Sequence, residues 1–382
     1  MNDLESALHA LSDDGSGSLP RPDLADRVLA RARQRGRRRG LLAATGAATV
    51  AVLITVGVSA VGQPARHRSA PGPAAATSSM SGFSKVRENV LLIGSDAGSD
   101  RTGVRPDTMI VASIDTRSGA TTLVGLPRDL ERVPFPAGSA QDAAYPNGYT
   151  CFRPGIGNSC ILNSLWTWAE TAGAKFYRGD KNPGLTATTQ AAEQITGLPV
   201  DNTVVLRMKG LQELVDAVGG VDVNVRQRLP IGGNPENDQA TGGWLEPGQQ
   251  HLSGYQALWY ARSRWSTTDY DRMGRQQCLI RALAQQVDGR KLVARFPKIA
   301  KILRSNLQTT ILARDLPHWA TLARKMATAR LQGITLIPTN SNSPDFAKFR
   351  LTVKQALATG KPGPGSNPTP SANSAADPNR EC

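Results

Sequence analysis

The longest apolar stretch of the chain is residues 41–62, LLAATGAATVAVLITVGVSAVG, which contains no charged side chain. As an α-helix these residues extend about 33 Å, enough to cross a hydrocarbon core about 30 Å thick. Six arginines lie within residues 31–39, and positive residues beside a membrane span stay in the cytoplasm. The pattern predicts a transmembrane helix at 41–62, a cytoplasmic arm at 1–40, and an extracytoplasmic position for all later residues.

A cleaved signal peptide is the alternative, with Val58–Ala60 as its small-residue cleavage site. The polar segment before the apolar run, and the apolar run itself, are both longer than in cleaved signal peptides. We therefore favour a retained signal-anchor helix.

After the span, short apolar runs alternate with helical periodicity. Three runs bounded by turn residues predict strands buried on both faces, at 89–93, 108–114 and 121–126. The other predicted elements are helices at 161–173, 185–196, 209–218, 270–287 and 313–329, and strands at 202–208, 221–225 and 334–338. This order of strands and helices predicts an α/β fold with helices on both faces of a sheet.

Composition divides the exported part into three segments. Residues 63–82 are rich in Pro, Ala, Ser and Gly and have no apolar period, which is typical of a flexible stalk. Residues 361–382 have the same character and are predicted to be disordered. Between them, residues 83–360 are predicted to form one globular domain, near the upper size for a single core.

The charge balance bears on the choice of partner. The chain has 45 Lys and Arg residues against 31 Asp and Glu, a net charge of +14. Residues 1–40 hold eight basic and six acidic side chains, so +12 of this charge lies beyond the predicted span. An exported basic domain disfavours nucleic acid as a partner and favours anionic substrates or lipid phosphates at the membrane.

Polar residues gather where the predicted strands end. They are Asp96 after the first strand, Arg105 and Asp107 before the second, and Arg128 after the third. If the first two strands are antiparallel neighbours, their loop brings Asp96 back beside Asp107. Two carboxylates suit Mg²⁺, which takes one or two and lets substrate phosphate complete its shell. For any one of these residues alone, a loop cap or a surface salt bridge is the commoner role.

A second polar group lies further along the chain, at Arg262, Arg264, Asp269, Arg272 and Gln276. Helical spacing places Asp269, Arg272 and Gln276 on one side of a helix start. These arginines and the two of the first group would repel one another unless anions lie between them. Guanidinium groups bind phosphate oxygens in bidentate fashion, so a diphosphate can engage several at once.

Taken together, five stretches of the sequence resemble the LytR-CpsA-Psr family. They are NVLLIGSD (89–96), RPDTMIVASID (105–115), LVGLPRDL (123–130), GLQELVDAVGGVDV (210–223) and HLSGYQALWYARSRWSTTDYDRMGRQQ (251–277). The resemblance covers about residues 83–290 strongly and the rest of the globular segment loosely. It implies an α/β/α sandwich with a mixed central sheet, preceded by one transmembrane helix.

The resemblance also implies an activity. Such a protein is a phosphotransferase of the cell membrane that uses Mg²⁺ or Mn²⁺ in cell wall assembly. It takes a glycopolymer from a polyprenyl diphosphate carrier and attaches it to peptidoglycan, commonly at the muramic acid 6-hydroxyl. Two alternatives stay open: a polyprenyl diphosphatase that hydrolyses the carrier without transfer, and a non-catalytic regulator.

The matching motifs imply a role for each candidate site residue. The implied metal ligands are Asp96 and Asp107, and the implied catalytic residues are Arg105 and Arg128. The implied diphosphate-binding residues are Arg262, Arg264, Arg272 and Gln276, while Asp269 orients Arg272 or binds the acceptor. The chain departs from the family just after Asp96, where a basic residue is common and Ala97 stands here.

A lipid chain also needs an apolar groove. Its candidate lining residues are Leu165, Trp166, Ile195, Leu211, Leu214 and Leu283. Ordinary core packing is the commoner role for each of them.

The cysteines carry separate information. Cys151 and Cys160 enclose eight residues of a Gly/Pro-rich loop, so a disulfide is expected in an exported domain. Cys278 lies in a predicted helix and is either a buried free thiol or paired elsewhere. With Cys382 there are four cysteines, which allow three pairings.

The predicted topology can be tested with reporter fusions. Because residue 300 lies beyond the predicted span, alkaline phosphatase fused there should be active and β-galactosidase inactive. The opposite result would place the domain in the cytoplasm and favour the regulator.

Overall fold

The computed structural model describes most of the globular segment. The described residues are 45–46, 86–96, 104–153, 157–158, 160–232, 242–264, 267–340 and 342–359. The predicted arm, stalk and tail lie outside them, as does the predicted span apart from β1 (Thr45–Gly46), which pairs antiparallel with β12 (Val287–Asp288). Within the described ranges, no helix combines the length and the apolar character that crossing a bilayer requires.

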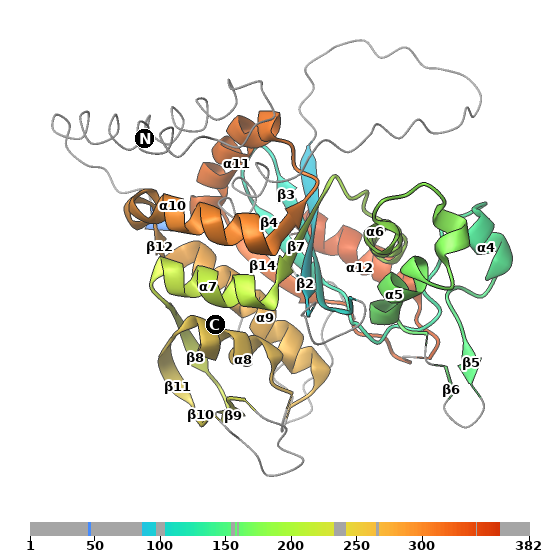
Figure 1. Cartoon of the computed structure of the whole chain (residues 1–382), viewed down its shortest axis with the longest axis horizontal. Helices are drawn as coiled ribbons and strands as arrows, with labels where there is room; N and C mark the ends of the chain where they lie inside the picture. The colour runs from blue at the N-terminus through green and yellow to red at the C-terminus, as the bar shows by residue number, and fades with distance from the viewer. Residues whose placement is uncertain are drawn as a thin grey trace.

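A six-stranded sheet forms the centre of the molecule (Figure 1). In spatial order its strands are β13 (Leu307–Thr309), β7 (Asn202–Arg207), β2 (Arg87–Ser95), β3 (Pro106–Asp115), β4 (Thr121–Gly125) and β14 (Leu331–Thr335). The pairs β2–β7 and β4–β14 are parallel, and the other three are antiparallel. The sheet is therefore mixed, and the chain folds as α/β.

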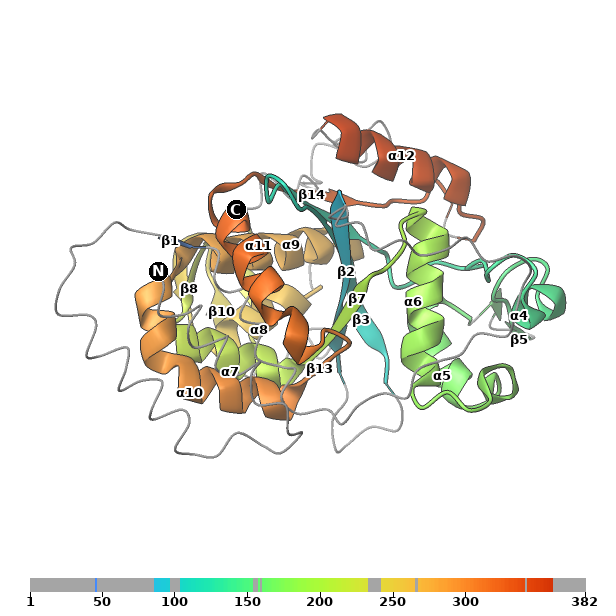
Figure 2. The same ribbon diagram turned by 90° about the horizontal axis from the view of Figure 1, so that it is seen from above.

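Helices cover both faces of this sheet, as expected from strands whose side chains are apolar on both faces. One face packs against α5 (Leu165–Glu170), α6 (Pro183–Thr196) and α12 (Phe346–Thr359). The other packs against α7 (Met208–Val218), α10 (Gly289–Asn306) and α11 (Leu316–Thr328). Neighbouring residues of β2 divide between the two cores, because successive strand side chains point to opposite faces: Leu91 joins the first and Val90 the second. Seen from above, β2 and β7 separate α6 from α7 and α10 (Figure 2).

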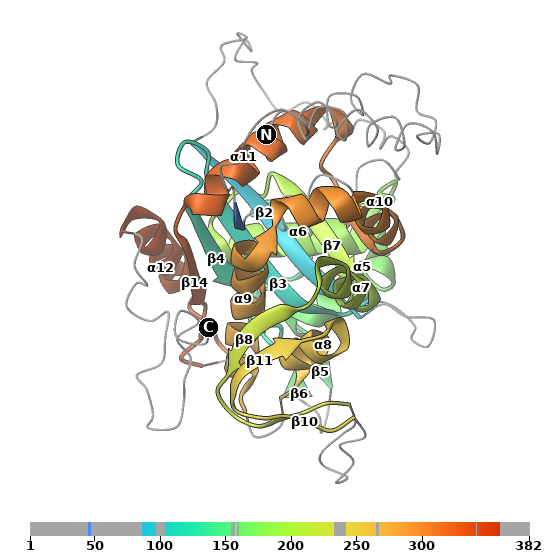
Figure 3. The same ribbon diagram turned by 90° about the vertical axis from the view of Figure 1, so that its left-hand side faces the viewer.

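A smaller unit lies beside the main sheet (Figure 3). Its strands are β8 (Val221–Val225), β9 (Leu229–Pro230), β10 (Trp244–Leu245) and β11 (Gly248–Leu252), which pair as β8–β11 and β9–β10. They share a core with α8 (Gly254–Arg262) and α9 (Asp269–Gln286). A capping box of Ser253 and Gln256 starts α8. A Cβ on Gly254 would lie 1.9 Å from the Gln212 carbonyl oxygen, so only glycine lets α8 dock this closely on α7.

Most predicted elements are confirmed, with some errors. The last strand was predicted at 334–338 and occurs at Leu331–Thr335. The helix predicted at 161–173 is a 3₁₀ turn, Leu162–Ser164, followed by the short α5. The sequence did not predict α8, α10 or α12, and Pro297 inside α10 obscures its pattern. Shorter elements complete the chain: α4 (Ala140–Ala144), β5 (Phe152–Arg153), β6 (Gly157–Asn158), and 3₁₀ turns at Ala174–Tyr177 and Ala313–Asp315.

Truncation of a central strand tests the importance of this core. Leu91 is fully buried in β2, so Leu91→Ala should lower the free energy of unfolding by about 3 kcal/mol. Leu351→Ala on α12 is the control, because Leu351 is 54% exposed and its loss should cost about 0.5 kcal/mol or less. Denaturant unfolding measures the free energy of unfolding of both variants. Similar losses in the two would contradict the placement of Leu91 in the core.

Candidate active site

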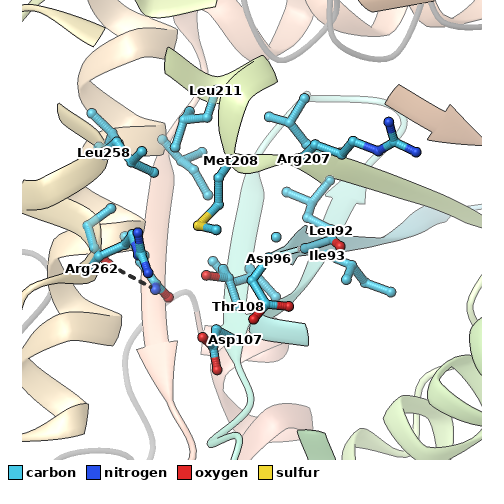
Figure 4. Close-up of a pocket in the computed structure, with 18 of the residues that line it drawn as sticks. Leu92, Ile93, Asp96, Asp107, Thr108, Arg207, Met208, Leu211, Leu258 and Arg262 are labelled. Atoms are coloured by element: carbon cyan, nitrogen blue, oxygen red, sulfur yellow. Dashed lines mark hydrogen bonds between the residues drawn. The ribbon is translucent and has the colours of Figure 1, made fainter. Parts of the chain in front are cut away.

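Two carboxylates meet where β2 ends and β3 begins. The antiparallel pairing of these strands, with an irregularity at Gly94/Ser95, brings Asp96 back towards Asp107, as predicted. Asp96 is 6% exposed, and its Oδ1 accepts a hydrogen bond from the Arg105 backbone N–H at 3.1 Å. Both carboxylates lie on the same side of a cavity (Figure 4).

Asp107 is paired with Arg128. Arg128 Nη1 lies 2.5 Å from Asp107 Oδ1, which joins the loop after β4 to the start of β3. Burial alone would raise the pKa of Asp107, but the hydrogen bond and charge of Arg128, with the charge of Arg272, outweigh burial and lower it. Asp107 is therefore ionised at neutral pH.

Asp269 is the centre of a second ion-pair group. Arg272 donates to it twice, from Nε to Oδ1 at 3.1 Å and from Nη2 to Oδ2 at 2.8 Å. Arg128 Nε lies 3.5 Å and Arg264 Nη1 3.8 Å from Asp269 Oδ1. Arg272 is 3% exposed, and its Nη1 also donates to the Asp107 backbone oxygen at 2.7 Å.

This arrangement revises one expectation from the sequence. We expected the clustered arginines to need a bound anion between them. Instead, Asp269 and Asp107 supply negative charge within the protein, and three arginines share Asp269. The site is partly neutralised before any ligand arrives.

The remaining predicted residues occupy different positions. Arg262 ends α8 and lines the cavity, with its guanidinium carbon 5.1 Å from the Trp259 ring centre. Gln276 is buried and donates from Nε2 to the Ala261 oxygen at 3.1 Å. The side chain of Arg264 is 53% exposed. Arg105 is exposed and, among the described residues, is not part of the cavity lining.

The cavity has a volume of about 230 Å³ and two chemically different ends. The polar end holds Asp96, Asp107, Arg128, Arg262, Arg264, Arg272 and Gln276. The apolar end lies between the sheet and helices α7, α8 and α9, and includes Leu92, Ile110, Leu211, Leu258, Ile280 and Leu283. Charged and apolar surfaces thus share one continuous cavity.

The predicted apolar lining was only partly right. Leu211 and Leu283 line the cavity. Leu165, Trp166 and Ile195 instead pack in the core on the opposite face of the sheet, and Leu214 packs in the core under α10. Sequence periodicity shows that a helical residue is buried, but not which face of a sheet covers it.

Sequence reasoning missed two supporting residues. Arg275 is 3% exposed and donates to the backbone oxygens of Tyr260, at 2.8 Å from Nε, and of Ser263. It thereby fixes the connection between α8 and α9. Asn163 is 4% exposed, and its backbone N–H donates to the Arg128 oxygen at 2.9 Å. Arg275 follows Arg272 by one helical turn, which was an available signal; Asn163 had none.

The structure shows the bonding state of three of the four cysteines. Cys151 and Cys160 form the expected disulfide, with an S–S distance of 2.02 Å. Cys278 is fully buried and also disulfide-bonded, so a free thiol at this position is ruled out. Cys382 lies outside the described residues.

Comparison with known proteins gives both sequence and fold relatives. The polyisoprenyl-teichoic acid–peptidoglycan teichoic acid transferase TagU of Enterococcus faecalis is 29% identical over 60% of this chain and 63% of its own length. Biofilm regulatory protein A of Streptococcus mutans is 28% identical over 58% of this chain and 50% of its own length. The chain thus spans between half and two thirds of the length of these relatives.

A crystal structure of a Streptococcus agalactiae protein has the same fold. It superposes with a TM-score of 0.51 at 21% identity, covering 73% of this chain and 90% of that one. The family match is more extensive, since the pattern of the LytR_cpsA_psr family runs across residues 60–358. On the extent of that match, together with the motif residues gathered at one cavity, the chain belongs to the LytR_cpsA_psr family.

Proposed function

We propose that this protein transfers a glycopolymer from a polyprenyl diphosphate carrier to peptidoglycan, at the muramic acid 6-hydroxyl. The observation that carries the proposal is the cavity with an arginine- and carboxylate-lined end and an apolar end. A polyprenyl diphosphate has the same two-part chemistry, a dianionic head on a hydrocarbon chain. The Enterococcus relative is named as a teichoic acid transferase, which supports the same reaction class.

The reaction forms one bond to phosphorus and breaks another. The acceptor hydroxyl oxygen attacks the phosphorus on the sugar side. The bond from that phosphorus to the bridging oxygen breaks, polyprenyl monophosphate leaves, and the hydroxyl proton passes to solvent. The products are a phosphodiester between glycopolymer and peptidoglycan and the free lipid phosphate.

The chain's own residues supply positioning and positive charge, the main requirements of phosphoryl transfer. Arg262 and Arg264 line the cavity and would stabilise the leaving phosphate. Arg128 lines the same cavity and is paired with both Asp107 and Asp269. Arg272 has three donor contacts to Asp269 and Asp107, so we assign it to orienting this group as well as to binding diphosphate. We assign Gln276 to binding the diphosphate from the same face of α9. We assign Arg105 to contacting the substrate from outside the cavity.

Asp96 and Asp107 are the residues that would hold Mg²⁺ or Mn²⁺. Among the described residues no group of three or more His, Cys, Asp or Glu side chains is arranged to hold a metal. Two carboxylates nevertheless fit Mg²⁺, which commonly takes one or two and fills its shell with water and substrate phosphate. The ion would neutralise charge on the nonbridging phosphate oxygens.

We further propose that the protein is a single-pass membrane protein. Residues 41–62 would span the bilayer, with the N-terminus in the cytoplasm and the domain at 83–360 outside. In the membrane, Thr45 and Gly46 would then not pair with β12. The support is the uncharged 22-residue run and the arginines before it. This topology brings the apolar cavity to the side of the membrane where peptidoglycan lies.

An assay with defined substrates tests the reaction. The full-length protein, a lipid-linked glycopolymer and a peptidoglycan oligomer should together yield the phosphodiester product, detected by mass spectrometry. Because charge neutralisation is required, EDTA should abolish transfer, and Mg²⁺ or Mn²⁺ should restore it. Carrier cleavage at the same rate without acceptor would identify a diphosphatase instead, and no cleavage at all would favour a regulator.

Substitution of single arginines tests the assignment of the site. Arg128→Ala removes the contacts to Asp107 and Asp269 and should lower kcat/KM about 100-fold. Arg105→Ala should also lower it strongly. Arg228→Ala is the matched control, because Arg228 is an exposed arginine paired with Glu246 outside the cavity. Normal transfer by both site variants in the purified assay would refute the assignment.

A further inference from the structure

Two residues of the stretches that resemble the family lie against each other outside the cavity. Gly125 ends β4, three residues before Arg128, and Gln277 lies in α9, five residues after Arg272. Both are buried, and neither is among the described residues that line the cavity. Their contact joins the two elements that position Arg128 and Arg272.

The absence of a side chain at Gly125 lets α9 pack directly on the backbone of β4. A Cβ at this position would lie 2.7 Å from Gln277 Nε2 and 3.1 Å from Met273 Cε. Met273 and Gln277 are one helical turn apart, so they belong to the same face of α9. Gly125 does not have the positive φ that favours glycine. Glycine is therefore needed here because the helix is close, and not because of the backbone conformation.

Gln277 ties α9 to the neighbouring strand at the same level of the sheet. Its Nε2 donates to the Ile334 backbone oxygen at 3.0 Å and to Thr335 Oγ1 at 3.4 Å. Thr335 is paired with Gly125 in the parallel register of β14 and β4. Gln277 is 2% exposed, so water cannot readily replace these contacts. The helix is thus held against the end of β4 and bonded to the end of β14.

The distance between α9 and the sheet affects two contacts of the candidate site. Arg128 Nε lies 3.5 Å from Asp269 Oδ1, and Arg272 Nη1 donates to the Asp107 backbone oxygen at 2.7 Å. Each contact joins the first turn of α9 to a residue at the end of a sheet strand. Each therefore lengthens if the helix moves away from the sheet.

We propose that Gly125 and Gln277 are positioning residues that together set the distance between α9 and the strand end before Arg128. Gly125 lets the helix approach, and Gln277 holds it there. Both act on the reaction through Arg128, Asp269 and Arg272. The kinetic consequence rests on the proposed function, whereas the structural consequence does not.

A double-mutant cycle tests whether the two residues act together. Gly125→Ala sets a methyl group against Gln277 and should push α9 outward, while Gln277→Ala removes both the tether and the atom that the methyl group meets. Each should lower kcat about tenfold or more, because small displacements of reacting groups strongly reduce the rate. The double variant should be no slower than Gln277→Ala alone, since the methyl group then has space. Losses that multiply in the double variant, or no loss in either single variant, would refute the proposal.

Two matched controls separate positioning from stability. Gln332 is 5% exposed, and its Nε2 donates to Thr122 Oγ1 at 3.0 Å and to the Ala356 oxygen at 3.2 Å. Gly173 is also buried, and a Cβ there would lie 2.7 Å from Trp168 Cδ2. Neither control residue lines the cavity.

Gln332→Ala and Gly173→Ala should each lower thermal stability about as much as the corresponding test variant, yet leave kcat within about twofold of wild type. If the controls lose as much kcat as the test variants, the effect is one of stability and the proposal is wrong. Should Gly125→Ala fail to fold, Gln277→Met fills the space of the glutamine without a donor. It must then lower kcat, and Gln332→Met must not.

Hydrogen–deuterium exchange tests the positioning without any assay of transfer. In the full-length protein in detergent, Gly125→Ala and Gln277→Met should raise exchange in peptides that cover residues 126–130 and 269–276. Gly173→Ala and Gln332→Met should not. Unchanged exchange in these peptides would overturn the inference. An inactive wild-type protein with the expected exchange pattern would refute only the proposed function.

Discussion

The candidate site depends on a chain of alternating charges, Asp107, Arg128, Asp269 and Arg272. Each member contacts the next, and Arg272 returns to the backbone oxygen of Asp107. The chain therefore joins the start of β3, the loop after β4 and the first turn of α9. Charges withdrawn from water are costly unless they are paired, and Arg272 is buried while the other three are partly buried. Separating these elements would therefore leave at least one of the charges without its partner. The same pairing lowers the pKa of Asp107 despite its burial.

The apolar half of the cavity has a different origin. It lies where α7, α8 and α9 stand over one face of the sheet, and the small unit of β8–β11 supports those helices. Gly254 allows α8 to dock closely on α7, and Arg275 fixes the connection from α8 to α9. Arg262 and Gln276 therefore reach the cavity from two helices whose relative position is set by packing outside it. The polar and apolar halves meet because α8 ends, and α9 begins, beside the charged residues of the site.

Much of the site could be predicted because its residues are close in sequence to recognisable strand and helix ends. Asp96 and Asp107 meet as expected, since an antiparallel pair must return to the same edge. Asp269 and Arg272 pair as one helical turn predicts. The position of Asn163 could not be predicted, because its backbone N–H donates to the Arg128 oxygen, 35 positions away, from a short 3₁₀ turn without periodicity. The prediction of the residues that line the apolar end was partly wrong for a similar reason. Leu165 and Leu211 have the same local pattern but pack on opposite faces of the sheet.

The sequence by itself determined the α/β class, the strands buried on both faces, and most of the charged residues that cluster. It also made the Cys151–Cys160 disulfide the expected pairing. Each of these depends on local spacing, composition or covalent geometry. Only the tertiary structure decided which anions balance the arginines, which helices enclose the cavity, and that the segment after Cys160 pairs with the loop that carries Arg128. Those outcomes depend on contacts between segments far apart in the chain, and local spacing carries no information about such contacts.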